Sequence, residues 1–247
     1  MTTIARHAGR AVDELRPISI TPGYIDYPEG SVLLELGDTR VLCNVTIEKG
    51  VPNWMKARDT QGGWITAEYA MLPRATQQRT AREVGKPRAR SQEIRRMIGR
   101  SLRAGFNLEE LPPITCIVDC DVLQADGGTR TAAVTGGYVA LAIALSSQIA
   151  AGDPVGNIFK SPIAAVSIGL LDGVPIVDLD YAEDSAAEAD VNIVMNEQGE
   201  LIEIQGTAER EPFTTDVLKQ MLHLANGSIG LLIRTQRLAL EEQGVPL

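Results

Sequence analysis

The stretch DVLQADGGTRTAAVTGG, from Asp121 to Gly137, decides the fold. A strand-like run leads into a turn at Gly127-Gly128, and a long segment of small residues follows at once. We expect that segment to form a helix over roughly residues 131–151, ending at Gly152-Asp153-Pro154. Its Ala, Gly and Ser residues suit close packing, so the stretch predicts a helix that lies directly against a sheet.

The residues before this stretch predict a sheet and a second helix. Residues 15–47 read as strands, and SVLLELGDTRVLCNVTI holds two β-rich runs separated by Gly37-Asp38, a good signal for a hairpin. Residues 50–64 predict a loop. Residues 73–91 are polar, basic and interrupted by Gly and Pro, which predicts an exposed, partly mobile segment. Apolar residues at helical spacing then predict a helix from Gln92 to Phe106.

The second half of the chain repeats the theme. SPIAAVSIGLL and VPIVDLDY flank Asp172-Gly173 and predict another hairpin. Two further strands are expected near Ala189–Met195 and Leu201–Gly206, and a final helix runs from about Thr214 towards Leu240. The order of elements indicates an α+β protein with two similar βα halves. No linker divides the halves, so we predict a single domain over residues 1–247.

The charge of the chain is unevenly distributed. The net charge of −9 argues, taken alone, against nucleic acid, whose phosphate backbone attracts Lys and Arg. Ten of the 23 basic residues nevertheless lie between Arg74 and Arg103, opposed only by Glu83 and Glu93. The segment from Asp172 to Asp216 holds 13 acidic residues and one Arg. This separation predicts a local anion site and, elsewhere, a cation site, with solvated surface as the alternative for the basic segment.

The Gly-Gly turn is a candidate anion site. The backbone N–H groups of Gly128, Thr129 and Arg130 are expected at the open N-terminus of the helix, where the helix dipole and free donors favour an anion. Thr129 adds a hydroxyl, and Arg130 adds a guanidinium that suits phosphate. A nucleotide-binding P-loop is excluded, because that motif needs a Lys before its last Ser or Thr. The alternative is an ordinary turn between a strand and a helix.

An acidic segment is a candidate metal site. In IVDLDYAEDSAAEADVNIV, from Ile176 to Val194, we expect Asp178 and Asp180 to alternate on one strand face. Asp184 and Asp190 follow across a short loop, and carboxylates gathered in this way suit Mg²⁺ or Mn²⁺. The alternative is a solvated acidic loop. The other acidic residues of this segment are Glu183 and Glu188.

The cysteines point to a reduced protein. Cys43, Cys116 and Cys120, with two His in the whole chain, argue against a structural zinc site and predict buried free thiols. The sequence shows no signal peptide and no apolar run long enough to span a bilayer. The default expectation is therefore a soluble, cytoplasmic protein without a membrane partner.

Five long motifs together resemble the signatures of one family. They follow one another in family order over nearly the whole chain, and they are similar to the consecutive signatures of RNase PH. They are RHAGRAVDELRP (Arg6–Pro17), GWITAEYAMLPRAT (Gly63–Thr76), EIRRMIGRSLRA (Glu93–Ala104), VDCDVLQADGGTRTAAVTGG (Val118–Gly137) and VDLDYAEDSAAEADVN (Val177–Asn192).

The resemblance implies both a fold and an activity. The fold is a single α+β domain in which two similar halves, with βαβ elements like those of ribosomal proteins, enclose a hydrophobic interface. The activity is that of a phosphorolytic nucleotidyltransferase, in which inorganic phosphate is the co-substrate and nucleoside 5′-diphosphates leave the 3′ end of RNA. The implied substrates are tRNA precursors extended beyond CCA and other RNA 3′ ends, with rRNA processing or degradation as a further role. The reaction also runs in reverse, DNA is not a partner, and the implied assembly is a homohexamer built as a trimer of dimers.

The resemblance also assigns residues. Arg90 and the trio Gly128, Thr129 and Arg130 match phosphate ligands of the family. Asp184 and Asp190 match its acidic pair, which holds Mg²⁺ or Mn²⁺ and acts in catalysis, and Asp178 matches a nearby carboxylate. The arginines that match tRNA-binding positions are Arg74, Arg79 and Arg82.

Two other functions remain open at this stage. A hydrolytic, metal-dependent nuclease would release monophosphates and ignore added phosphate. A catalytically silent RNA-binding ring subunit would lack either the Arg pair, Arg90 and Arg130, or the Asp pair, and this chain has both. The proton for the leaving 3′-oxygen is expected from a water on the metal or from protonated Asp184.

Overall fold

Strand-forming residues in the first half build a mixed five-stranded sheet. The computed structural model describes residues 6, 9–85, 88–150 and 157–245. The strand order is β1-β2-β3-β5-β4, in which only the β4–β5 pair is parallel. The strands are β1 (Ile18–Pro22), β2 (Gly30–Leu36), β3 (Thr39–Lys49), β4 (Trp64–Met71) and β5 (Ile114–Gln124).

The second half builds a four-stranded antiparallel sheet in the order β7-β6-β8-β9. Both hairpins predicted from sequence are confirmed, at Gly37-Asp38 and at Asp172-Gly173. Asp172 and Gly173 have φ angles of 46° and 73°, in the left-handed region that turns of this kind require. The strands are β6 (Ile163–Leu171), β7 (Val174–Val177), β8 (Ala189–Asn196) and β9 (Leu201–Ala208).

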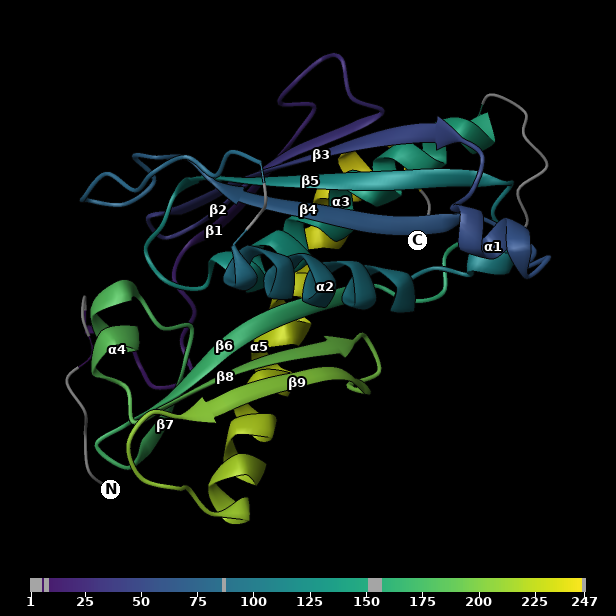
Figure 1. The fold of residues 1–247 in the computed structure, drawn as a ribbon. Coiled ribbons are helices and arrows are strands. Elements are labelled where there is room, and N and C mark those ends of the chain that lie inside the picture. Colours follow the sequence, from purple (N-terminus) through teal and green to yellow (C-terminus); the bar gives the residue numbers. More distant parts are fainter. Residues whose placement is uncertain (1–5, 7–8, 86–87, 151–156, 246–247) are drawn as a thin grey trace.

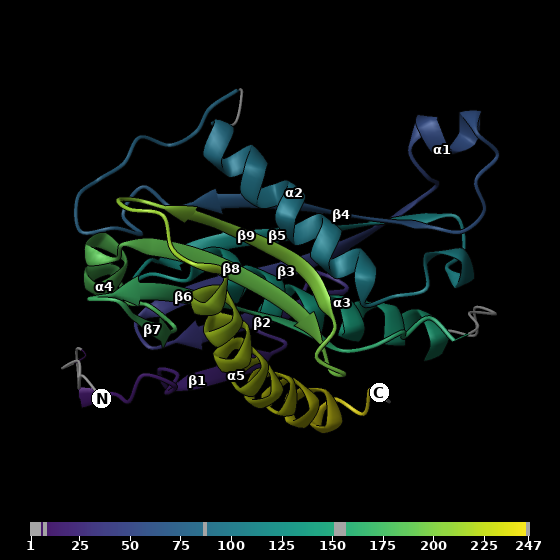
Figure 2. The ribbon, with the colours of Figure 1, turned by 90° about the horizontal axis from the view of Figure 1, so that it is seen from below.

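The helices separate and cover the two sheets, so that sheets and helices alternate in four layers (Figure 1, Figure 2). The helices α2 and α3 lie between the sheets, and α5 covers the far face of the second sheet. Alternate residues of β6 show this, because Ile163 and Ala165 join the core around α3 whereas Ala164 and Val166 join the core around α5. The helices are α1 (Asn53–Ala57), α2 (Ala89–Ala104), α3 (Thr129–Ala150), α4 (Tyr181–Ala186), α5 (Thr215–Glu242) and the 3₁₀ helix η2 (Leu108–Glu110).

Small residues bring α3 into direct contact with the first sheet. A Cβ atom added to Gly30 of β2 would lie 2.0 Å from the carbonyl oxygen of Ala140, and one added to Gly136 would lie 3.1 Å from the Cys43 sulfur. Neither approach leaves room for a larger residue. The predicted close packing of this helix is therefore confirmed, and so is the α+β class with two halves. That residues 1–247 act as one domain stays a prediction.

One boundary and three short elements differ from the sequence-based expectation. Strand β4 was not predicted, although Ile65, Ala67 and Tyr69 alternate inward along it. Helix α2 begins three residues early, because the Glu83 carboxylate accepts hydrogen bonds from the backbone N–H of Arg88 and from the Ser91 hydroxyl. The short helices α1 and η2 were also not predicted, and α1 lies within the expected loop at 50–64.

One expected feature, the end of α3 at Gly152-Asp153-Pro154, falls outside the described residues. The three cysteines are buried free thiols, as predicted, and burial raises the pKa of Cys116 to about 12. None of the helices, over the residues that the structure describes, has the length and apolar character needed to cross a membrane.

Gln236 ties the C-terminal helix to both halves. Its side chain has no exposed surface, and its Nε2 group donates hydrogen bonds of 2.9 Å to the carbonyl oxygens of Thr135 and Ile163. Thr135 belongs to α3 and Ile163 to β6, so one side chain on α5 joins three elements.

We expect Gln236→Ala to lower the free energy of unfolding by about 2–4 kcal/mol, because it leaves two buried carbonyl groups without this donor and opens a cavity. Urea denaturation at a fixed protein concentration measures the change. The matched control is Gln220→Ala, an exposed glutamine on the same helix, which should change stability by less than about 0.5 kcal/mol. Equal midpoints for the two variants would contradict the assigned role.

Candidate active site

A pocket of about 360 Å³ lies where the two halves meet. The first half contributes the Gly-rich turn and the starts of α2 and α3, and the second half contributes β6, α4 and β8. The six residues that the family resemblance assigned to phosphate or metal binding line it, together with Ser167 and Asn192. The predicted residues are Arg90, Gly128, Thr129, Arg130, Asp184 and Asp190.

The Gly-rich turn places the start of α3 in this pocket. Gly127 and Gly128 have φ angles of 75° and 64°, a backbone conformation that glycine adopts without strain. A Cβ atom on Gly127 would lie 2.3 Å from the carbonyl oxygen of Leu179, so the turn touches the second half directly. The N–H groups of Thr129 and Arg130 are in the first helical turn and have no acceptor within the helix. Together with the helix dipole they form a cradle for an anion.

Two arginines add positive charge to this cradle from different helices. Arg90 is exposed in the first turn of α2, and Arg130 is in the first turn of α3. Burial raises the pKa of Asp184, and the charges of both arginines oppose that shift, so both act on the same carboxyl group. The Arg130 guanidinium is held by Gln205, whose Oε1 accepts at 3.2 Å, and by a 3.5 Å ion pair with Glu93.

Tyr69 is a member of the site that sequence reasoning missed. It lies on β4 with 5% of its surface exposed, and its hydroxyl forms a 2.8 Å hydrogen bond with the Thr129 hydroxyl. Burial raises the pKa of Tyr69, which keeps the phenol neutral and able to orient Thr129. The available signal was the alternation of β4, which turns Tyr69 inward with Ile65 and Ala67, where a phenol needs a polar partner.

The two predicted carboxylates lie close together on the other wall. Burial raises the pKa of Asp190, and the charge of Asp184 raises it further. One oxygen of Asp190, Oδ1, is buried without a hydrogen-bond partner, while Oδ2 accepts a 3.3 Å hydrogen bond from Asn192. Two adjacent carboxylates with an unpaired oxygen fit a divalent cation.

The number of carboxylates also indicates which cation fits. Over the described ranges, no group of three or more His, Cys, Asp or Glu side chains is arranged to hold a metal. Mg²⁺ is commonly bound by one or two carboxylates, with water and substrate phosphates completing its shell. Asp184 and Asp190 are thus residues that could hold a cation of this kind, with its remaining ligands supplied from outside the protein.

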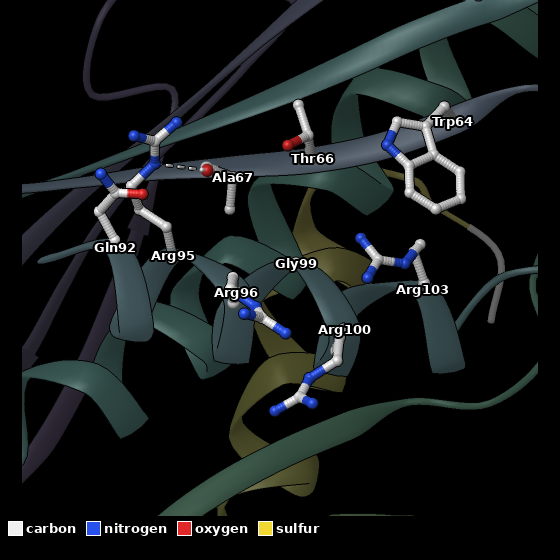
Figure 3. A pocket seen from close by; sticks show the side chains of 9 residues that line it. All are labelled: Trp64, Thr66, Ala67, Gln92, Arg95, Arg96, Gly99, Arg100 and Arg103. Carbon is white, nitrogen blue, oxygen red and sulfur yellow. Dashed lines mark hydrogen bonds between the residues drawn. The ribbon is translucent and has the colours of Figure 1, made fainter. Parts of the chain in front are cut away.

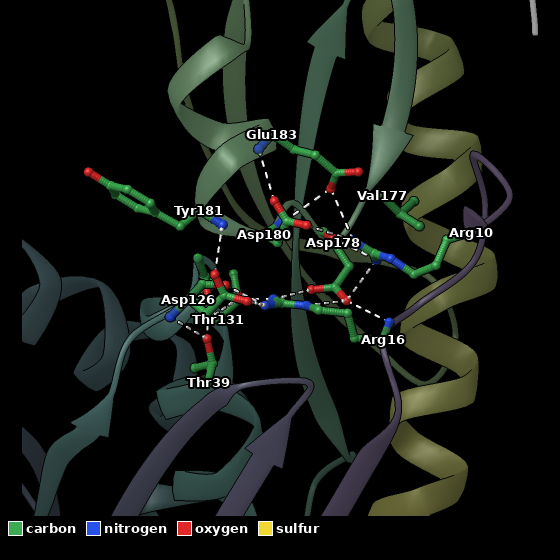
Figure 4. A network of polar contacts seen from close by, with 12 residues as sticks. Arg10, Arg16, Thr39, Asp126, Thr131, Val177, Asp178, Asp180, Tyr181 and Glu183 are labelled. Carbon is green, nitrogen blue, oxygen red and sulfur yellow. Dashed lines mark hydrogen bonds and ion pairs between the residues drawn. The ribbon is translucent and has the colours of Figure 1, made fainter. Parts of the chain in front are cut away.

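Asp178 and Asp180 have structural roles, which corrects the expectation that they alternate on one strand face of a metal site (Figure 4). Strand β7 ends at Val177, so the two residues do not alternate on a strand. Asp178 has no exposed surface and pairs with Arg16 at 2.7 Å, and Asp180 accepts a hydrogen bond from the backbone N–H of Glu183 to cap α4. A buried aspartate held by arginine is unavailable to a metal.

Part of the arginine-rich segment also has a structural role. A second pocket, of about 310 Å³, lies between α2 and the free edge of β4 (Figure 3). There Arg95 donates to the carbonyl oxygen of Ala67 at 3.4 Å, and Arg103 donates to that of Ile65 at 3.0 Å while its guanidinium lies 4.5 Å from the ring centre of Trp64. These arginines satisfy the exposed edge of a sheet, so the local charge excess is not all available to an anion.

The three arginines predicted to bind tRNA lie outside the pocket lining. Arg74, Arg79 and Arg82 are exposed on the segment between β4 and α2. That segment is anchored at Ala75, which is buried and whose carbonyl oxygen accepts a 2.8 Å hydrogen bond from the N–H of Ala125. These arginines are thus on a segment that borders the pocket but are absent from its lining, while the mobility of the segment stays a prediction.

Comparisons with known proteins show the family and the fold. Two models of the 3′ exoribonuclease family match, domain 1 over residues 14–146 and domain 2 over residues 161–228. Similar solved structures include rice (Oryza sativa) Rrp46, with 22% identity, a TM-score of 0.76 and coverage of 95% of this chain and 100% of that one. The Archaeoglobus fulgidus exosome with RNA bound to the active site has 23% identity and a TM-score of 0.79, with coverage of 93% of this chain and 91% of that one. An archaeal exosome core has 20% identity and a TM-score of 0.75, with coverage of 93% of this chain and 90% of that one. At these identities the structures show that the fold is shared.

The cradle predicts that inorganic phosphate binds to the protein and that Arg130→Ala and Arg90→Ala each weaken this binding about tenfold or more. Each change removes a charged donor, and such hydrogen bonds contribute about 1.5–3 kcal/mol. Calorimetric titration with phosphate measures the affinity. Arg96→Ala, an exposed arginine of α2 in the second pocket, is the matched control and should bind phosphate normally. Unchanged affinity in Arg130→Ala would remove the cradle assignment.

Proposed function

The chain belongs to the 3′ exoribonuclease family of the RNase PH type, and we propose that it is a phosphate-dependent 3′-to-5′ exoribonuclease. It would transfer the terminal nucleotide of an RNA to inorganic phosphate, release a nucleoside 5′-diphosphate and run in reverse with diphosphates as substrates. One observation carries this proposal: an anion cradle and a pair of carboxylates open into the same pocket from opposite halves of the chain.

The cradle offsets the repulsion between the two reactants. Phosphate is an anion that must approach an anionic diester, and the side chains of Arg90 and Arg130 supply positive charge where it approaches. The Thr129 hydroxyl, oriented by Tyr69, and the N–H groups at the start of α3 hold the phosphate oxygens. These groups would fix the attacking oxygen in line with the bond that breaks.

The carboxylates serve the leaving side of the reaction. Asp184 and Asp190 would hold Mg²⁺ or Mn²⁺, which when bound supplies charge stabilisation to the transferring phosphoryl group. The leaving 3′-oxygen must gain a proton. The two candidate donors are a water molecule in the pocket and the carboxyl group of Asp184, the latter only while it is protonated and holds no cation.

Two rival functions fit the pocket less well. A hydrolytic nuclease would use water as its nucleophile and would need no second anion site beside the carboxylates. A silent RNA-binding subunit would need neither Arg90 and Arg130 nor Asp184 and Asp190, and here the two pairs line one pocket. Phosphorolysis uses both pairs.

The proposed substrates are tRNA precursors extended beyond CCA, other RNA 3′ ends, and rRNA in processing or degradation. The Archaeoglobus fulgidus exosome, which shares the fold, carries RNA at its active site. We also propose a homohexamer that is a trimer of dimers. Exposed Arg74, Arg79 and Arg82 would contact the body of the tRNA while its 3′ end enters the pocket.

Incubation of the protein with an RNA that bears a 3′ extension, with and without phosphate, tests the function. We expect nucleoside diphosphates as products, only when phosphate is present. Asp184→Asn should remove turnover while RNA binding stays largely intact, because it removes a charge and hardly alters shape. Monophosphate products that ignore added phosphate would establish hydrolysis instead, and full activity of Asp184→Asn would make Asp184 a surface residue.

The exposed arginines allow RNA holding to be separated from chemistry. We expect joint replacement of Arg74, Arg79 and Arg82 by Ala to weaken binding of precursor tRNA and to flatten its salt dependence. The reason is that fewer phosphate contacts form, so binding releases fewer counterions. Processing of a short single-stranded oligonucleotide should suffer much less. Filter binding across a salt series and oligonucleotide turnover measure the two effects.

The matched control carries the same loss of charge at three other exposed arginines, Arg58, Arg96 and Arg234, and should keep its affinity for tRNA. Size-exclusion chromatography decides between tRNA binding and subunit contact. A triple variant that stays hexameric and loses tRNA affinity supports the assignment. A dimer that processes tRNA normally per active site refutes it.

A further inference from the structure

A buried ion pair joins the N-terminal segment to the second half behind the cradle (Figure 4). Arg16, with 6% of its surface exposed, meets Asp178, with none. The backbone N–H and the Nε group of Arg16 donate to Oδ2 of Asp178 at 2.7 and 3.0 Å, and a terminal nitrogen donates to Oδ1 at 2.7 Å. Three such contacts fix the orientation of the guanidinium.

The other donors of this guanidinium reach the cradle itself. Arg16 donates to the carbonyl oxygens of Asp126 and Gly127, the latter at 3.4 Å. The fully buried hydroxyl of Thr39 donates to the same Gly127 oxygen at 2.6 Å and accepts a 3.0 Å hydrogen bond from the N–H of Asp126. A Cβ atom on Gly37 would lie 2.6 Å from Cδ of Arg16, so this glycine makes room for the side chain.

These contacts set the direction of the donors that face the pocket. The carbonyl of Gly127 and the N–H of Gly128 belong to one planar trans peptide, in which the two groups point in opposite directions. Holding the Gly127 oxygen on the Arg16 side therefore turns the Gly128 N–H towards the phosphate side. The carbonyl of Asp126 and the N–H of Gly127 are related in the same way.

The same pair is also tied to the element that carries Asp184. Asp178 has a φ angle of 52°, a left-handed conformation that its side-chain and backbone contacts must maintain. Its N–H donates to the carbonyl oxygen of Ser167 at 2.7 Å. On the other side of the pair, Oδ1 of Asp126 accepts a 3.2 Å hydrogen bond from the N–H of Tyr181, the first residue of α4. The turn and α4 are thus held through one network.

We propose that Arg16 and Asp178 are positioning residues, and that with Thr39 they fix the Gly127–Gly128 peptide so that its N–H is aimed at phosphate. This inference rests on the proposed function only in naming phosphate as the ligand. A purely structural pair would affect stability alone. A positioning pair affects the affinity for phosphate even where the protein remains folded.

Thr39 and Arg16 provide the test, with inorganic phosphate as the probe in calorimetric titrations of the full chain. We expect Arg16→Lys, which keeps the charge and loses the fork, and Thr39→Val, which keeps the shape and loses the hydroxyl, to weaken phosphate binding about tenfold. Thr39→Ser should restore it. Arg10→Lys is the matched control, because Arg10 contacts Asp178 and Glu183 and no carbonyl of the turn, and it should bind phosphate normally.

In turnover assays the Michaelis constant for phosphate should rise in the same two variants, while that for a short RNA stays within about twofold. Wild-type affinity for phosphate in Thr39→Val and in folded Arg16→Lys would overturn the inference, as would equal weakening in Arg10→Lys. If Arg16→Lys fails to fold, the Thr39→Val and Thr39→Ser pair decides. A wild-type protein that binds phosphate but releases no diphosphates refutes the proposed function, and the binding data still decide this inference.

Discussion

The arrangement of the site depends on one packing constraint, the direct contact of α3 with both sheets. The helix can lie between the sheets because small residues occur both on the helix and on the strands that face it. Gly30 of β2 lies against Ala140 of the helix, and Gly136 of the helix lies against Cys43 of β3. A helix held on two sides has little freedom to slide or tilt. Its first turn, with Thr129 and Arg130, therefore occupies a fixed place between the halves. The anion cradle is thus the exposed end of a helix that is otherwise buried in the core.

Electrostatics then explains why the pocket is divided between the halves. Carboxylates that lie close together repel each other, and burial raises the pKa values of both Asp184 and Asp190. The charges of Arg90 and Arg130 oppose the shift at Asp184. At the pocket the first half contributes the positive charges of Arg90 and Arg130, and the second half contributes the negative charges of Asp184 and Asp190. The junction of the halves brings the two signs together. The local field thus differs from what the net charge of −9 suggests.

Much of this was accessible from the sequence, and the limits have physical causes. The two hairpins and the turn at Gly127-Gly128 are local signals, so periodicity and turn residues predicted them. The placement of Asp178 and Asp180 on one strand face was predicted wrongly, because β7 ends at Val177. A run of acids also does not reveal that Arg16 lies 2.7 Å from one of them across 162 residues of chain. Tyr69 was missed for the same reason, since its partner Thr129 lies on another element.

The arginines show how the same side chain serves different purposes in one fold. Arg103 donates to one carbonyl oxygen at the free edge of β4 and lies over Trp64, Arg16 is buried against Asp178, and Arg90 remains exposed at the pocket. What separates them is the number of acceptors that the protein itself offers. A guanidinium whose donors already meet carbonyl and carboxylate oxygens has little left for a ligand, whereas one with unused donors attracts an anion. A charged segment can therefore hold arginines of both kinds, and a count of charges along the chain cannot tell them apart.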